Sequence, residues 1–146
     1  LSGNGYLEPE LLPSQINTGK NRYNAFVSQD ESWVIIPALG RDDSFGGTDY
    51  YISFRNPDDT WEEPVNLGPE FNSAWDGEYS ASLSPDGKYL FFMSTRVSAE
   101  LLHPDSLSYG LFTRFLQSTG NGNSDIYWVN VSVLEKLRLN LIPDEK

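Results

Sequence analysis

Short runs of apolar and aromatic residues alternate with polar turns along most of the chain, a pattern typical of β-strands. Residues 25–28 and 33–36 flank one short polar turn, and residues 80–83 and 89–94 flank the turn sequence Ser-Pro-Asp-Gly. Proline presets the backbone of such a turn and glycine allows a positive φ. We therefore expect each pair of runs to form a β-hairpin.

Further strands are expected after each hairpin. Residues 49–55 and 125–131 are rich in aromatic and β-branched side chains, which favour a third strand in each case. Residues 61–67 form a candidate fourth strand, separated from the third by the turn-rich sequence Asn-Pro-Asp-Asp.

The chain also repeats its own sequence. Three pairs of segments match: 6–18 with 61–73, 26–36 with 82–92, and 47–52 with 123–128, at offsets of 55, 56 and 76 positions. The second copy therefore carries about 20 extra residues between its second and third strands. Four strands in a repeat of roughly 50 residues predict the blade of a β-propeller.

Two helices are expected besides the strands. In the inserted segment, residues 97–122, apolar side chains recur at helical spacing after Pro104, which predicts a short amphipathic helix. These side chains are Leu107, Leu111, Phe112, Phe115 and Leu116. Ser132 and Glu135 have the spacing of a capping box, so we expect one or two turns of helix to end the last repeat and pack on it.

Composition and charge narrow the range of partners. The 146 residues include 21 acidic and 10 basic side chains, a net charge of −11, which opposes binding to nucleic acids or anionic lipid surfaces. Cysteine is absent, so disulfides and zinc–thiolate sites are excluded. No apolar run approaches the roughly 18 residues of a membrane-spanning helix. A hydrophobic fraction of 38% is enough for one folded domain over residues 1–146.

One stretch resembles a known repeat family. Residues 84–96 (SPDGKYLFFMSTR) and 122–129 (GNSDIYWV) closely resemble the PD40 repeat of TolB-like, WD40-like propellers. Residues 46–51 (GGTDYY) and 61–72 keep this pattern in the first copy, whereas residues 29–32 lack its Pro, Gly and Lys. The resemblance covers about residues 6–138 except the insertion. It implies an all-β fold of two four-stranded antiparallel blades, about residues 24–73 and 79–131, in a partial propeller.

The resemblance also implies a function. The chain is similar to the C-terminal part of PD40 proteins of the bacterial envelope, which implies a periplasmic, outer-membrane-associated or secreted protein with its export signal upstream. Such a protein is expected to be a non-catalytic binding or scaffolding module for a protein or glycan. A closed propeller needs about four to eight blades, so we also expect upstream blades or self-association.

Two loops hold the residues that we expect to bind the ligand. Arg41, Asp42 and Asp43 lie in one loop, and Trp75, Asp76 and Glu78 in the other. An exposed indole can stack on the apolar face of a sugar, and the acids can hydrogen-bond to its hydroxyl groups.

Other aspartates have a structural interpretation. Asp30 and Asp86 fall at equivalent turn positions, where a carboxylate can accept hydrogen bonds from backbone N–H groups. The resemblance to the PD40 repeat suggests that Asp49 and Asp125 anchor turns between blades. Calcium is the one cofactor considered, because Asp42, Asp43 and Asp49 concentrate hard oxygen ligands within one loop.

The alternative function is that of a glycoside hydrolase or lyase. It would use two loop acids about 5 to 10 Å apart across a cleft. The candidates are Asp42, Asp43, Asp76 and Glu78. His103 is the sole histidine and has no evident triad partners, so it is given no role. The non-catalytic function is favoured.

Overall fold

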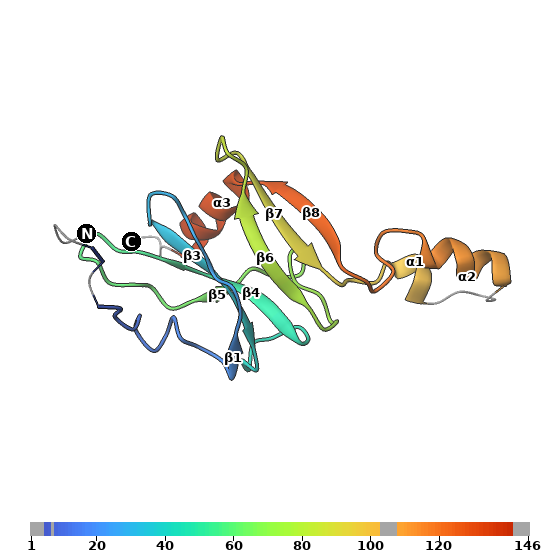
Figure 1. Ribbon diagram of the computed structural model, residues 1–146, viewed down its shortest axis with the longest axis horizontal. Coiled ribbons are helices and arrows are strands. Elements are labelled where there is room, and N and C mark those ends of the chain that lie inside the picture. Colours follow the sequence, from blue (N-terminus) through green and yellow to red (C-terminus); the bar gives the residue numbers. More distant parts are fainter. Residues whose placement is uncertain (1–4, 7, 103–107, 142–146) are drawn as a thin grey trace.

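A computed structural model describes residues 5–6, 8–102 and 108–141. This part of the chain forms two open antiparallel sheets and three helices, so it is mostly β and compatible with the expected all-β class (Figure 1). The strands are β1 (Asn21–Arg22), β2 (Phe26–Val27), β3 (Trp33–Leu39), β4 (Thr48–Phe54), β5 (Val65–Asn66), β6 (Glu78–Leu83), β7 (Tyr89–Ser94) and β8 (Asp125–Asn130). The helices are α1 (Ala99–Leu102), α2 (Tyr109–Leu116) and α3 (Ser132–Leu141).

The first sheet has the order β1-β3-β4-β5, with β2 also paired to β3, and the second has the order β6-β7-β8. The predicted strands are present, with ends that differ by one to three residues at most positions. The expected strand over residues 61–67 is reduced to β5 and an isolated bridge between Arg55 and Trp61. Pro64, which has no N–H for the ladder, interrupts it.

The two sheets share one register. Adding 56 to a residue number in β3 and 76 to one in β4 converts the first ladder into the second, and these are the offsets found in the sequence. Thus the pairs Val34–Ser53, Ile36–Tyr51 and Ala38–Asp49 become Leu90–Val129, Phe92–Tyr127 and Ser94–Asp125. The repeat found in the sequence therefore corresponds, residue by residue, to the same strand pairing in both sheets.

The sheets stack front to back. We call the side of the first sheet that carries Ile35 and Ile52 its front, and the equivalent side of the second sheet, with Phe91 and Trp128, the front of that sheet. The main core joins the front of the first sheet to the back of the second. It contains Ile35, Tyr50, Ile52, Phe54, Leu90 and Phe92. A smaller core on the back of the first sheet contains Val34, Ile36, Ala38, Tyr51 and Ile16.

The front of the second sheet is left uncovered by this stack. Ile126 and Trp128 expose 79% and 60% of their surface, whereas the equivalent residues of the first sheet, Tyr50 and Ile52, are completely buried. Equivalent positions thus share a register and an apolar character but differ in burial.

Helix α2 confirms the helix expected in the insertion. The Ser108 hydroxyl accepts a hydrogen bond from the Leu111 amide at 3.2 Å and caps it, and Leu107 lies outside the described residues. None of the residues of α2 is fully buried, and α1 and α2 stand away from the sheets (Figure 1).

Helix α3 is longer than the one or two turns expected, with 10 residues. Its start is capped by the Asn130 side chain, which accepts a hydrogen bond from the Ser132 amide at 3.0 Å. Leu134 is buried in the main core, and the Arg138 guanidinium lies 5.3 Å from the centre of the Phe54 ring. In the described residues, no helix has the length and apolar character needed to cross a membrane.

The stacking of the two sheets can be tested at two isoleucines on their front sides, Ile35 in the first sheet and Ile126 in the second, because only Ile35 is buried. We expect Ile35→Ala to lower the free energy of unfolding by about 2–5 kcal/mol, because Ile35 is completely buried. The change Ile126→Ala should cost less than about 0.5 kcal/mol, because Ile126 is exposed. Urea unfolding of both variants in dilute solution measures the difference, and equal costs would contradict the stacking of the sheets.

Candidate functional site

The two loops expected to bind a ligand lie side by side. The Gly47 amide donates a hydrogen bond to the Trp75 carbonyl at 3.2 Å. A Cβ on Gly46 would lie 2.6 Å from the Ala74 carbonyl carbon, and one on Gly47 would collide with Asp76. The approach of the loops therefore requires glycine at both positions.

A shallow pocket of about 300 Å³ opens where these loops meet. Phe45 and Trp75, which expose 47% and 45% of their surface, both line it, together with Ser73 and Arg96. Arg96 is held in place because Nη2 donates to the carbonyls of Glu70 and Phe71 at 3.0 and 2.8 Å. The pocket thus combines two aromatic side chains with a fixed basic group.

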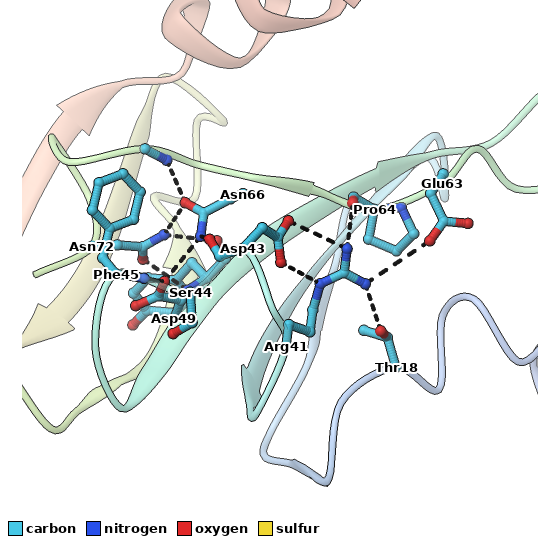
Figure 2. A network of polar contacts seen from close by, with 12 residues as sticks. Thr18, Arg41, Asp43, Ser44, Phe45, Asp49, Glu63, Pro64, Asn66 and Asn72 are labelled. Atoms are coloured by element: carbon cyan, nitrogen blue, oxygen red, sulfur yellow. Dashed lines mark hydrogen bonds and ion pairs between the residues drawn. The ribbon is translucent and has the colours of Figure 1, made fainter. Parts of the chain in front are cut away.

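Arg41 is a structural residue rather than a free cation at the loop surface (Figure 2). Its Nε lies 3.0 Å from Asp43 Oδ1, its Nη1 donates to Thr18 Oγ1 at 2.5 Å and its Nη2 to the Pro64 carbonyl at 3.4 Å. The guanidinium also lies 4.6 Å from the centre of the Tyr51 ring. Burial alone would raise the pKa of Asp43, but the hydrogen bond and charge of Arg41 outweigh it and lower this pKa.

Asp49 anchors the first loop from inside the sheet (Figure 2). Its Oδ2 accepts hydrogen bonds from the Phe45 amide at 2.6 Å and from Asn66 Nδ2 at 2.9 Å. Asn72 Nδ2 donates to Asn66 Oδ1 at 2.8 Å, and Asn72 Oδ1 accepts from the Tyr50 amide at 2.8 Å. This chain of side chains fixes Phe45, and hence one wall of the pocket, to the start of β4.

The other aspartates with a structural interpretation also accept backbone N–H bonds. Asp125 Oδ2 accepts from Gly120 at 2.7 Å, and Asp30 and Asp86 each accept from the amide two residues ahead at 3.2 Å. Glu31 has a φ of 58° where the second repeat has Gly87 at 70°, so both turns have the same left-handed residue.

The sequence reasoning missed the two serines that close these turns. Ser28 Oγ and Ser84 Oγ accept from the amides of Trp33 and Tyr89 at 3.1 and 3.0 Å. Their equivalence at an offset of 56 positions was the available signal.

The acids of the proposed calcium site do not gather around one point. Asp43 is paired with Arg41, Asp49 Oδ2 faces the Phe45 amide, and Asp42 is exposed. Across the described ranges, no three Asp, Glu, His or Cys side chains form a group that could hold a metal ion. Calcium binding stays a prediction from the loop sequence.

Glu78 lies inside the molecule, whereas the neighbouring Asp76 is exposed. Glu78 is the first residue of β6 and is completely buried, and its Oε1 accepts from the hydroxyl groups of Ser73 and Ser94 at 2.7 and 2.9 Å. Its Oε2 has no hydrogen-bond partner among the described residues. Burial raises the pKa of Glu78, and the two serine hydrogen bonds offset this only in part.

Arg96 was not predicted as a ligand-binding residue, whereas Phe45 lies in the loop segment 41–45 that was expected to face the ligand. Phe45 sits in a glycine-rich loop, and Arg96 ends the PD40-like string after β7, so both positions were visible in the sequence. Their convergence depends on how the two sheets stack. Comparison with protein-family models, with curated proteins and with solved structures finds no match for this chain.

The buried carboxyl of Glu78 makes stability depend on pH. Since its pKa is higher in the folded chain, the folded chain holds the Glu78 proton more tightly than the unfolded chain does. This contribution to stability is present below the ordinary pKa of 4.5 and is lost as pH rises through the raised folded pKa. We therefore expect the difference in the free energy of unfolding between the wild-type chain and Glu78→Gln to fall as pH rises from below 4.5 through the raised pKa of Glu78.

Urea unfolding at a series of pH values measures this difference. Glu8→Gln is the matched control, because Glu8 is exposed and its replacement should leave the pH dependence unchanged. A wild-type pH profile parallel to that of Glu78→Gln would contradict the assignment.

Proposed function

We propose that this chain is a non-catalytic binding module of the PD40 type, built from two propeller blades, which binds a glycan in the pocket between Phe45 and Trp75. The observation that carries the proposal is the convergence of these two half-exposed aromatic side chains where two loops meet.

The blade interpretation is supported by the repeat. Both sheets are antiparallel, their ladders have equivalent registers, and they stack front to back, as consecutive blades of a propeller do. The first sheet has strands at all four positions of a blade, and the second has three. The resemblance of residues 84–96 and 122–129 to the PD40 repeat favours the same fold and a site of action in the bacterial envelope or outside the cell.

The chemistry of the pocket favours a sugar ring. Aromatic faces bind the apolar C–H face of a sugar, and neighbouring polar groups take its hydroxyl groups. Ser73 and Arg96 line the same pocket and supply polar groups beside the two rings. A basic group at the pocket also suits a sugar acid.

The hydrolase alternative gains no support from two of its candidate acids, Glu78 and Asp43. Glu78 is completely buried and accepts hydrogen bonds from Ser73 and Ser94. Asp43 is held by Arg41. A glycosidase needs two carboxyl groups that face each other across the sugar.

The binding proposal is tested by Trp75→Ala. An array of neutral and acidic oligosaccharides is first screened with the wild-type chain, and calorimetry then measures the affinity for those that bind. Because Trp75 supplies one of the two aromatic faces, we expect Trp75→Ala and Phe45→Ala each to weaken binding at least about tenfold, which corresponds to about 1.4 kcal/mol.

Trp128→Ala is the matched control, because Trp128 is an exposed tryptophan outside the pocket. Equal losses in Trp75→Ala and Trp128→Ala would contradict the assigned site. A wild-type chain that binds no oligosaccharide would rule out the glycan.

A further inference from the structure

The N-terminal segment repeats residues that have two roles later in the chain. Residues 6–18 match residues 61–73 at an offset of 55 positions. In the later copy, Val65 and Asn66 form β5 and pair with Ile52 and Tyr51 of β4. Phe71, five residues after the end of β5, is buried against the back of the second sheet, where its ring centre lies 5.1 Å from that of Phe92.

The second role, the burial of an apolar side chain against the back of a sheet, is also found in the N-terminal segment. Ile16 aligns with Phe71 and is likewise buried, but on the back of the first sheet. It lies there in one core with Ile36, the residue equivalent to Phe92. The segment is therefore in register with the repeat in space as well as in sequence.

Within the part of the chain that the structure describes, the N-terminal segment does not fulfil the first role, that of a paired strand. Tyr6 and Leu11, which align with Trp61 and Asn66, expose 92% and 93% of their surface. Residues 8–12 belong to no strand. Trp61, in contrast, is half-buried, with its ring centre 5.8 Å from the Arg55 guanidinium. A segment with the sequence of a fourth strand thus lies outside both sheets.

The second sheet lacks the strand that this segment resembles. Its strand order ends at β8, and over the described residues nothing pairs with β8 in the place that β5 has beside β4. By the repeat offsets, Trp128 and Tyr127 of β8 correspond to Ile52 and Tyr51, the partners of β5. An unpaired strand edge is a template for a further strand.

The donor and the acceptor lie at opposite ends of the stack. Ile16 fixes the N-terminal segment to the back of the first sheet, whereas β8 belongs to the second sheet, which covers the front of the first. The first sheet therefore lies between the segment and β8 of its own chain. A second copy can offer its β8 without this obstacle.

We propose that the N-terminal segment of one copy pairs, through Glu10 and Leu11, with Trp128 and Tyr127 of β8 in a second copy and completes its sheet as a fourth strand. Each copy has one donor segment and one acceptor edge, so the assembly closes when every edge is filled, in a dimer or a ring. Main-chain hydrogen bonds supply the contact and the repeat sets the register.

Cysteine cross-linking tests the register, because the natural chain has no cysteine. Glu10 and Trp128 correspond to Val65 and Ile52, which are directly paired in β4 and β5. Paired positions of this kind have Cα atoms about 5.5 Å apart, within the range of a disulfide. Glu10→Cys and Trp128→Cys replace exposed side chains, so both variants should fold.

The two single variants are mixed and oxidised, and disulfide-linked heterodimers are counted by mass spectrometry. We expect at least fivefold more of them than from Glu10→Cys mixed with Ser82→Cys, which places an exposed thiol on the opposite edge strand, β6. Equal yields would overturn the proposal. So would a double variant, Glu10→Cys with Trp128→Cys, that cross-links only within one monomer.

Light scattering after size exclusion gives a second measurement, at physiological ionic strength because copies with a net charge of −11 repel each other. We expect the wild-type chain to form dimers or rings as concentration rises. Glu10→Pro, which removes a ladder N–H, should shift this association to at least tenfold higher concentration, and Glu10→Ala should not. A wild-type chain that stays monomeric at all concentrations, or equal association of both variants, would overturn the proposal.

Discussion

The structure depends on the contact that Tyr50 makes between the two sheets. Its hydroxyl group lies within hydrogen-bond distance of two backbone carbonyls, those of Tyr79 in β6 and Met93 in β7, and donates its one hydrogen to one of them at a time. It also accepts a hydrogen bond from the Met93 amide at 3.2 Å. The ring lies edge-on to Phe92, with the ring centres 6.2 Å apart. Burial raises the pKa of this hydroxyl, so it stays a donor. Through Tyr50, strand β4 sets where the second sheet lies and hence where its loops meet those of the first.

The same contact explains why equivalent residues have unequal roles. In the second repeat, the position of Tyr50 is taken by Ile126, which is exposed because no further sheet covers it. The repeated sequence thus specifies strands that pair in the same register. Which of their apolar residues are buried in the core depends on whether another sheet packs against that side. A series of sheets that stack front to back leaves one front and one back uncovered unless the stack closes on itself.

Much of the fold was predictable from the sequence, because strands and turns depend on residues close to each other in the chain. β7 and the turn at Asp86 follow from local alternation and from Pro85 and Gly87. The candidate site was less predictable. The sequence places Arg41 and Glu78 in polar loops. In the structure, the Arg41 guanidinium is held by Asp43 and Thr18. Glu78 is buried beside Ser94 because the two sheets stack. Thr18 is 23 positions from Arg41 and Ser94 is 16 positions from Glu78, so only the tertiary structure brings these pairs together.

The rigidity of the pocket follows from these buried polar contacts. Phe45 is held through its amide by Asp49, Asp49 is held by Asn66, and Asn66 by Asn72, so that one wall of the pocket is tied to the core of the first sheet. The other wall, at Trp75, is tied to the first by the amide of Gly47. A ligand that enters between the two aromatic side chains therefore orders little of the backbone, which reduces the entropic cost of binding. This favours the proposed sugar ligand, because the small free-energy gain from stacking on two rings would not be lost in ordering the loops.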